Sequence, residues 1–298
     1  MKKQLTVIVA CHKKLSRLEL TLEALMAQNI ISDCNLIIVA DGASEQVKSC
    51  AHRYSGESVK VIESPGLGRS GARNLGARAA QTEFLLFLDD DILTRPDFLQ
   101  LHLEQQNKQP GYVHGKLREL IGFLRVVDPK LGAVGAPPVL PEQLASGQWR
   151  PDGYRLMTSK LERAAEMSFS GEAGVRVPWL AGAGANLSIP KALWQEVGGF
   201  DESFGLKWGM EDIDFAYRVY QASSKLYFND KACGYHMSHY EENRWLQQDD
   251  NLQRFLAKFS EIENQLLSLL LSANGTPQAY FQALREKLIS APESAAAN

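Results

Sequence analysis

Strand-like and helix-like segments alternate over the first hundred residues, and this alternation limits the possible folds more than any other feature. Two strands of one sheet that are joined through a helix run parallel, with a right-handed crossover. The segments "LTVIVA" (5–10) and "EFLLFLD" (83–89) are apolar runs typical of strands covered on both faces. Further strands are predicted at 35–41, 59–64 and 225–230, and helices at 71–80, 97–106, 211–221 and 246–290. We therefore predict an α/β fold with a mostly parallel central sheet flanked by helices and a C-terminal helical extension.

The first helix is predicted to begin at a capping box. Ser16 and Glu19 have the Ser-x-x-Glu spacing in which two side chains bond reciprocally to backbone N–H groups. By contrast, residues 107–175 carry frequent Gly and Pro without a clear period. We interpret them as a connecting or partner-facing region.

Three consecutive carboxylates, Asp89, Asp90 and Asp91, directly follow the apolar strand at 83–89. Ligands of open α/β sheets bind outside the carboxyl ends of the strands. Adjacent carboxylates repel one another, and protons or a cation must neutralise them. Oxygen ligands suit Mg²⁺ or Mn²⁺, which in turn suit phosphate-bearing substrates. The alternative is a solvated acidic turn in which Asp91 or Thr94 caps the next helix.

A second acidic element, the pair Glu211 and Asp212, lies at a predicted helix start. A glycine-containing segment that includes Trp208 precedes it. A carboxylate there could accept a proton from a hydroxyl, and the indole offers a stacking surface for a sugar. The alternative is a favourable interaction of the two acids with the helix dipole. Downstream, His236 and His239 lie three positions apart, and either could be a metal ligand or a structural residue.

The segment "GLGRSG" (66–71) matches the G-x-G-x-x-G pattern of dinucleotide-binding proteins. It follows the third predicted strand rather than the first, and three acids stand where a single ribose-binding carboxylate is needed. We favour a glycine loop that approaches a nucleotide, with Arg69 and Arg73 supplying positive charge.

Net charge, cysteine spacing and the length of apolar runs limit the classes of protein to which this chain can belong. A formal net charge of −3 over 298 residues argues against a nucleic-acid-binding protein. The four cysteines show no metal-type spacing, which suggests free thiols in a reducing compartment. The start of the sequence resembles a first strand rather than a signal peptide, and no apolar run approaches about 20 residues. A cytoplasmic location is expected.

Taken together, these stretches resemble the inverting family 2 glycosyltransferases of the GT-A fold. The segment "VADGAS" (39–44) is similar to the family's Val-Asp-Asp-Gly-Ser element, with Ala40 in place of the commoner first Asp. Residues 66–91 are similar to the segment that leads into the family's Asp-x-Asp motif. Residues 179–219 look like the catalytic half shared with galactosyltransferase-type C-terminal domains, including a Trp-Gly-x-Glu-Asp core.

The resemblance implies a metal site. Asp91 would ligate an Mn²⁺ or Mg²⁺ ion that bridges the diphosphate of a nucleotide sugar. His239 would be the second protein ligand, with His236 as the alternative, and Asp89 would face the ribose or the ion.

The resemblance also implies a catalytic pair. Asp212 would be the general base, and Glu211 would bind the acceptor or orient Asp212. The candidate residues for binding the nucleotide sugar are Cys11, His12, Asp41, Arg69, Arg73, Asp89, Asp90, Gly184 and Trp208.

On this reading, residues 1–240 form the glycosyltransferase domain, with a nucleotide-binding half (1–100) and an acceptor and catalytic half (177–240). Residues 241–298 form the C-terminal extension, whose helices could pair subunits or touch a membrane at its periphery; the oligomeric state is left open. The expected donor is a UDP-sugar, and the acceptor is a saccharide or another hydroxyl compound. A metal-dependent nucleotidyltransferase and a non-catalytic nucleotide-sugar-binding protein are the alternatives.

Overall fold

The computed structural model describes residues 3–125, 139–239 and 243–290. The strands are β1 (Leu5–Cys11), β2 (Cys34–Asp41), β3 (Val59–Ser64), β4 (Phe84–Asp89), β5 (Ile92–Thr94), β6 (Tyr112–Leu120), β7 (Leu156–Met157), β8 (Asn186–Pro190) and β9 (Leu226–His236). The α-helices are α1 (Leu15–Met26), α2 (Glu45–Arg53), α3 (Gly68–Ala79), α4 (Phe98–Lys108), α5 (Pro141–Ala145), α6 (Lys160–Ser170), α7 (Lys191–Glu196), α8 (Glu211–Ser223), α9 (Arg244–Lys258), α10 (Ile262–Gln265), α11 (Ser268–Leu271) and α12 (Pro277–Ser290).

The strands form one sheet in the order β3-β2-β1-β4-β8-β6-β9-β5, with β7 paired to β6. The strands β3, β2, β1 and β4 run parallel, and β8 lies antiparallel between β4 and β6. Beyond β8, the strands β6 and β9 pair parallel to each other. The predicted α/β fold with a mostly parallel sheet is confirmed. Because β1, β2 and β4 share a direction, their carboxyl ends at Cys11, Asp41 and Asp89 meet at one edge.

Alternate side chains of each strand enter two separate cores, as the two-residue period of a strand requires. Ile8 and Phe87 pack with the helices α3 and α8 on one face of the sheet. Val7 and Leu86 pack with α1, α2 and α4 on the other face. Both faces are therefore covered, which explains why these strands are apolar throughout.

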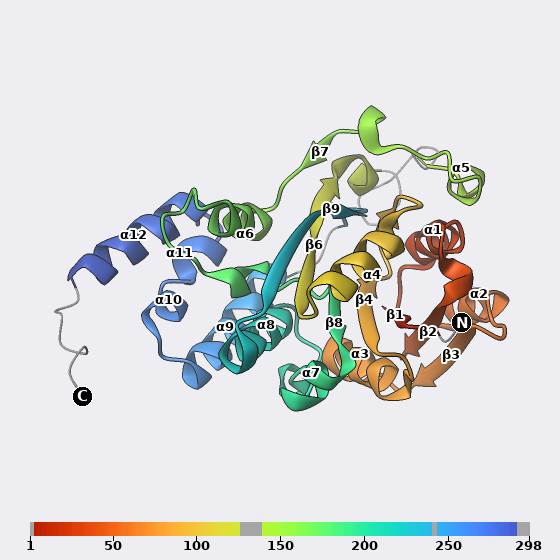
Figure 1. Ribbon diagram of the computed structural model, residues 1–298, viewed down its shortest axis with the longest axis horizontal. Coiled ribbons are helices and arrows are strands. Elements are labelled where there is room, and N and C mark those ends of the chain that lie inside the picture. The colour runs from red at the N-terminus through yellow and green to blue at the C-terminus, as the bar shows by residue number, and fades with distance from the viewer. Residues whose placement is uncertain (1–2, 126–138, 240–242, 291–298) are drawn as a thin grey trace.

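The predicted C-terminal helices are present as α9 to α12. Together with α6 they lie at the opposite end of the molecule from β1, β2 and β3 (Figure 1). Phe255 of α9 is fully buried and packs near Trp179. Within the described ranges, none of the helices has the length and apolar character that crossing a bilayer demands.

Two local predictions differ from the structure. The predicted capping box is wrong, because α1 already begins at Leu15 and its N-cap, Lys14, makes no side-chain capping bond. Instead, the side chain of Lys14 reaches Asp91. The described parts of 107–175 are also more regular than predicted, since they contain β6 and α6, while 126–138 lie outside the described residues.

Candidate functional site

The acidic triplet lies where β4 ends, and its three side chains point to different partners. Asp89 is the last residue of β4, with a side chain that is 32% exposed, and it contacts Arg73. Asp90 and Asp91 follow in the turn before β5, and both face Lys14. The Lys14 ammonium is 2.5 Å from Asp91 Oδ2 and 3.6 Å from Asp90 Oδ1. The triplet is therefore neutralised by two cations rather than solvated as a simple acidic turn.

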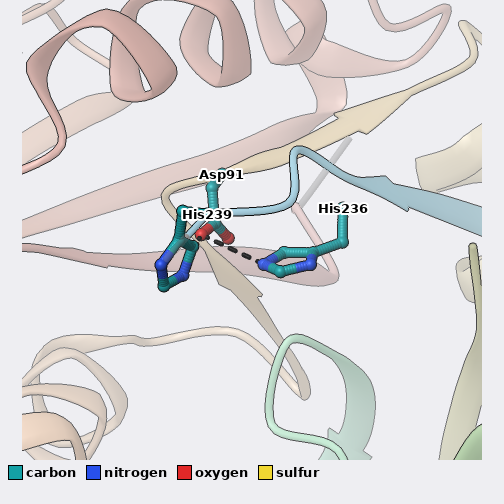
Figure 2. A group of neighbouring side chains, drawn as sticks. All are labelled: Asp91, His236 and His239. Carbon is teal, nitrogen blue, oxygen red and sulfur yellow. Dashed lines mark hydrogen bonds and ion pairs between the residues drawn. The ribbon is translucent and has the colours of Figure 1, made fainter. Parts of the chain in front are cut away.

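Asp91 is joined by both predicted histidines. The Nε2 atoms of His236 and His239 lie 3.2 Å and 3.3 Å from Asp91 Oδ2. Figure 2 shows the three side chains turned toward one another, Asp91 from the β4–β5 turn and the histidines from the end of β9 and the residues after it. One ligand atom from each residue lies within 4.8 Å of the others. Residues 145 positions apart thus converge at one point.

A divalent cation fits this cluster. The Asp91 side chain is 1% exposed, and its Oδ1 has no hydrogen-bond partner among the described residues, which leaves a buried acceptor that a cation would satisfy. One carboxylate and two imidazoles are a donor set that binds first-row transition ions. The Lys14 ammonium already brings positive charge to Asp91 Oδ2, so an ion and this ammonium would compete for the same oxygen.

Glu119 of β6 orients His236. Its Oε2 lies 2.7 Å from His236 Nδ1 and also accepts a hydrogen bond from Ser238 Oγ. Burial alone lowers the pKa of His236, but the charges of Asp91 and Glu119 outweigh it and raise that pKa to about 10. On the other side of the loop, Arg17 of α1 donates to the carbonyl oxygens at positions 237 and 238. The loop that carries both histidines is therefore fixed from two directions.

We expect Glu119→Gln to weaken Mn²⁺ binding by about 10- to 100-fold, the usual cost of removing a carboxylate that orients a metal-binding histidine. The amide oxygen could still accept from Nδ1–H, but the negative charge that supports the imidazole is lost. Calorimetric titration with Mn²⁺ measures the effect, with exposed Glu104→Gln on α4 as the control. Equal affinities for the wild type and Glu119→Gln would show that Glu119 does not support the ligand.

Arg73 of α3 connects the acidic sheet edge to the start of α8. Its guanidinium group donates to Asp89 Oδ1 at 2.7 Å and to Glu211 Oε1 at 3.1 Å. The Arg73 side chain is only 4% exposed, so these ion pairs satisfy a buried charge. A Cβ atom on Gly184 would lie 2.7 Å from Arg73 Cζ, so the backbone at this position must lack a side chain.

Glu211 and Asp212 form the first turn of α8, as predicted. The preceding Met210 has a φ of +74°, a left-handed conformation that is rare outside glycine. Asp212 accepts hydrogen bonds from the backbone N–H groups of Ile213 at 2.9 Å and Gly184 at 3.4 Å. Burial, and then the neighbouring charge of Glu211, raise the pKa of Asp212 to about 7. With a pKa in this range, the Asp212 carboxylate can take up or release a proton near neutral pH.

The carboxylate of Asp41 organises the glycine loop. Its Oδ1 accepts hydrogen bonds from Ser64 Oγ, Gly66 N and Leu67 N, and its Oδ2 accepts from Gly68 N, over distances of 2.6–3.1 Å. In a dinucleotide fingerprint, such a glycine turn must bring its backbone close to a pyrophosphate. Here those N–H groups are already engaged by Asp41, which disfavours the dinucleotide interpretation.

The other residues near the end of β1 that were predicted to bind the nucleotide make fewer described contacts with the rest of the site. Cys11 is buried at the end of β1, and burial raises the pKa of its thiol. His12 is exposed, with its Nδ1 2.7 Å from the carbonyl oxygen of Asp41. Asp90 is 6% exposed, and burial raises its pKa to about 6 despite Lys14.

None of the described contacts joins the predicted residues Arg69 and Trp208 to the Asp91 cluster. Arg69 is half-buried in the first turn of α3. Trp208 is half-buried before α8, and the guanidinium carbon of Arg244 lies 4.0 Å from its ring centre.

Sequence reasoning missed three residues of this site: Lys14, Arg17 and Glu119. Lys14 and Arg17 follow the first strand in "HKKLSR", where the interpretation as a helix start gave their charges no partner. Glu119 lies on a strand that was not predicted. For this residue, the mixed segment "VHGKLREL" gave no signal.

Two protein-family models match this chain. One is described as "Glycosyl transferase family 2" and covers residues 6–122, and the other is described as "N-terminal domain of galactosyltransferase" and covers residues 167–242. The chain is similar to glycosyl transferase family 2 over the first of these segments. The two matched segments contain the acidic triplet, the α8 carboxylates and both histidines.

Curated relatives agree with the family. The chain is 27% identical over 228 residues to a validoxylamine A glucosyltransferase of Streptomyces hygroscopicus subsp. jinggangensis, covering 72% of this chain and 51% of the relative. It is 24% identical over 248 residues to a chondroitin synthase of Escherichia coli, covering 78% of this chain and 34% of the relative. The chain thus spans about half or less of these relatives' lengths.

Solved structures show the fold. A mannosyltransferase from Pyrobaculum calidifontis, in complex with GDP-Man and Mn²⁺, superposes with a TM-score of 0.58 at 14% identity, covering 98% of this chain and 76% of that one. S. aureus TarS 1-349 gives a TM-score of 0.56 at 16% identity, with the same coverage. The chain therefore has the predicted GT-A architecture.

Proposed function

We propose that this protein transfers a sugar from a nucleotide-diphosphate sugar, with UDP as the nucleotide, to a saccharide hydroxyl with inversion at the anomeric carbon. The observation that carries the proposal is the convergence of Asp91, His236 and His239 at the same sheet edge that Arg73 ties to the start of α8. The similarity to glycosyl transferase family 2 and the relatives named as glycosyltransferases support it.

Asp212 is the proposed general base. It would accept the proton of the acceptor hydroxyl while that oxygen attacks the anomeric carbon, in a single displacement that inverts the configuration. Its pKa near 7 suits this role, because a base is most effective when its pKa is close to the working pH. Glu211 is ion-paired to Arg73 and would fix the position of Asp212.

The proposed metal ligands are Asp91, His236 and His239. A bound Mn²⁺ or Mg²⁺ would neutralise charge on the leaving diphosphate. Of the two ions, Mn²⁺ suits a site with two imidazole ligands better. At the carboxyl end of β2, Asp41 would keep the glycine loop in place for the nucleotide. In the loop before α8, Trp208 would offer a stacking face to a sugar.

We expect the transfer rate to depend on pH through Asp212. Only the ionised carboxylate accepts a proton, so kcat should rise with pH, reach a plateau above about 7, and fall about tenfold for each unit below. Steady-state rates from pH 5.5 to 8.5 at saturating Mn²⁺ measure this. Asp212→Asn should give a low, flat profile over the same range. A flat wild-type profile between pH 6 and 8 would contradict the assignment.

The experiment that tests the function is product analysis after incubation with UDP-sugars, Mn²⁺ and a panel of saccharides. We expect UDP release and a new glycosidic linkage whose anomeric proton coupling shows inversion. Release of pyrophosphate would instead identify a nucleotidyltransferase. Binding of a UDP-sugar and Mn²⁺ without turnover of any acceptor would identify a non-catalytic binding protein.

A further inference from the structure

Helix α9 begins after the last residue of both matched segments, so the family comparison gives it no role. Its side chains nevertheless bind the loop at 205–209, which leads directly into Glu211 and Asp212. Gln247 Oε1 accepts a hydrogen bond from Trp208 N at 2.8 Å. Asn251 Nδ2 donates to the carbonyl oxygens of Trp208 at 3.3 Å and Gly209 at 2.9 Å. Both polar backbone groups of Trp208 are therefore bound by α9.

The two side chains act from one face of α9, because residues four apart in a helix are neighbours. Asn251 is 2% exposed, so its bonds to the loop are shielded from water. The guanidinium group of Arg244, one turn earlier, stacks on the Trp208 ring. A further ion pair joins Lys207 to Asp250, but both side chains are more than half exposed and this pair adds little.

The residue that joins this loop to α8 needs such support. Gly205 and Gly209 have φ values of +63° and +92°, which glycine adopts without strain, but Met210 has a φ of +74°. A left-handed non-glycine residue persists only where its surroundings enforce it. On the opposite side, the loop touches the first residue of α3, where a Cβ atom on Gly68 would lie 2.5 Å from the carbonyl oxygen of Gly205. The loop is thus held between the glycine loop and α9.

At its C-terminal end α9 also holds α8. Lys258 forms ion pairs with Asp214 on α8 and with Asp201. Phe255 anchors the helix in the core. Helix α9 therefore contacts the segment before Asp212 and the helix turn after it, and it sets where Trp208 lies relative to that carboxylate.

We propose that α9 forms a wall of the acceptor subsite, and that Gln247 and Asn251 are positioning residues that hold Trp208 for the acceptor saccharide. This inference rests on the proposed function. It assigns the C-terminal extension a part in acceptor binding, while the proposed donor and metal sites lie elsewhere, at the carboxyl ends of β1, β2, β4 and β9.

The first test needs no substrate. Trypsin cleaves after Lys207, so loosening the loop should expose this bond. We expect Gln247→Leu and Asn251→Ala to accelerate cleavage after Lys207 about tenfold, since each removes hydrogen bonds that stabilise the closed loop. Gln247→Glu keeps the accepting oxygen and should cleave at the wild-type rate. Asn264→Ala, which removes a buried amide that contacts Glu261 instead of the loop, controls for general destabilisation.

The second test uses the donor and acceptor that the wild type turns over. Gln247→Leu and Asn251→Ala should raise the acceptor KM about tenfold and leave the donor KM and Mn²⁺ affinity within about twofold. Gln247→Glu should restore the acceptor KM. An equal rise in donor KM, or an unchanged acceptor KM, would overturn the proposal. If the wild type transfers no sugar, the proposed function fails, and the cleavage rates still decide whether these residues hold the loop.

Discussion

Asp212→Asn is expected to lower the transfer rate by about 10²- to 10⁴-fold, the usual contribution of a positioned general base. Asparagine has nearly the same shape and can still accept one of the two hydrogen bonds, because Ile213 and Gly184 donate to different oxygens of Asp212, but it cannot take up the acceptor proton. Donor affinity should stay nearly unchanged, because none of the described contacts joins Asp212 to the Asp91 cluster. Single-turnover rates at saturating donor, with calorimetric titration of UDP in the presence of Mn²⁺, separate these effects.

The matched control is Asp214→Asn, on the same helix. Asp214 is fully buried and paired with Arg218 and Lys258, so its replacement should cost stability rather than catalysis. A large loss of UDP affinity in Asp212→Asn, with the rate of bound donor preserved, would mean that Asp212 serves the donor instead of the proton.

Asp91→Asn is expected to abolish metal-dependent turnover and to weaken Mn²⁺ binding by more than about 100-fold. Among the described residues, Asp91 supplies the one carboxylate of the cluster, and its loss should cost more than that of a residue behind a ligand. Lys14 keeps Asp90 as a partner at 3.6 Å and is partly exposed, so the fold should remain intact. Circular dichroism checks the fold, and rates across a Mn²⁺ titration check the activity.

Asp90→Asn is the control for this variant. It removes a neighbouring carboxylate of the same turn that faces Lys14 but does not belong to the cluster with the histidines. Its Mn²⁺ affinity should stay much closer to the wild-type value. Wild-type turnover by Asp91→Asn at limiting Mn²⁺ would show that the metal assignment is wrong.

The predictable part of the fold was the part whose sequence has a simple period. The strands β1 and β4 are apolar throughout because α-helices cover both faces, and they end where polar residues begin at the ligand edge. In contrast, β6 mixes charged and apolar residues, and its register with β9 shifts between Gly115 and Leu117. Because that irregularity interrupts the two-residue period, neither the strand nor the position of Glu119 beside His236 could be predicted from the residue pattern.

The same reasoning explains which site residues could be predicted. The approach of Asp91 to His236 and His239 was predictable from the residue types and from the family resemblance. The hydrogen bonds from Arg17 to the loop that carries both histidines could not be predicted, because Arg17 binds backbone carbonyl groups, which carry no sequence signal. Likewise, the bonds from Gln247 and Asn251 go to the backbone of Trp208 and leave no motif.

Pulsed electron paramagnetic resonance of Mn²⁺ bound to the wild type is the most direct test of the central claim, that one cation joins Asp91 to both histidines. We predict hyperfine coupling to two imidazole nitrogens, with one coupling lost in His236→Ala and the other in His239→Ala. Bound Mn²⁺ without nitrogen coupling, or with the same coupling in both variants, would contradict the account.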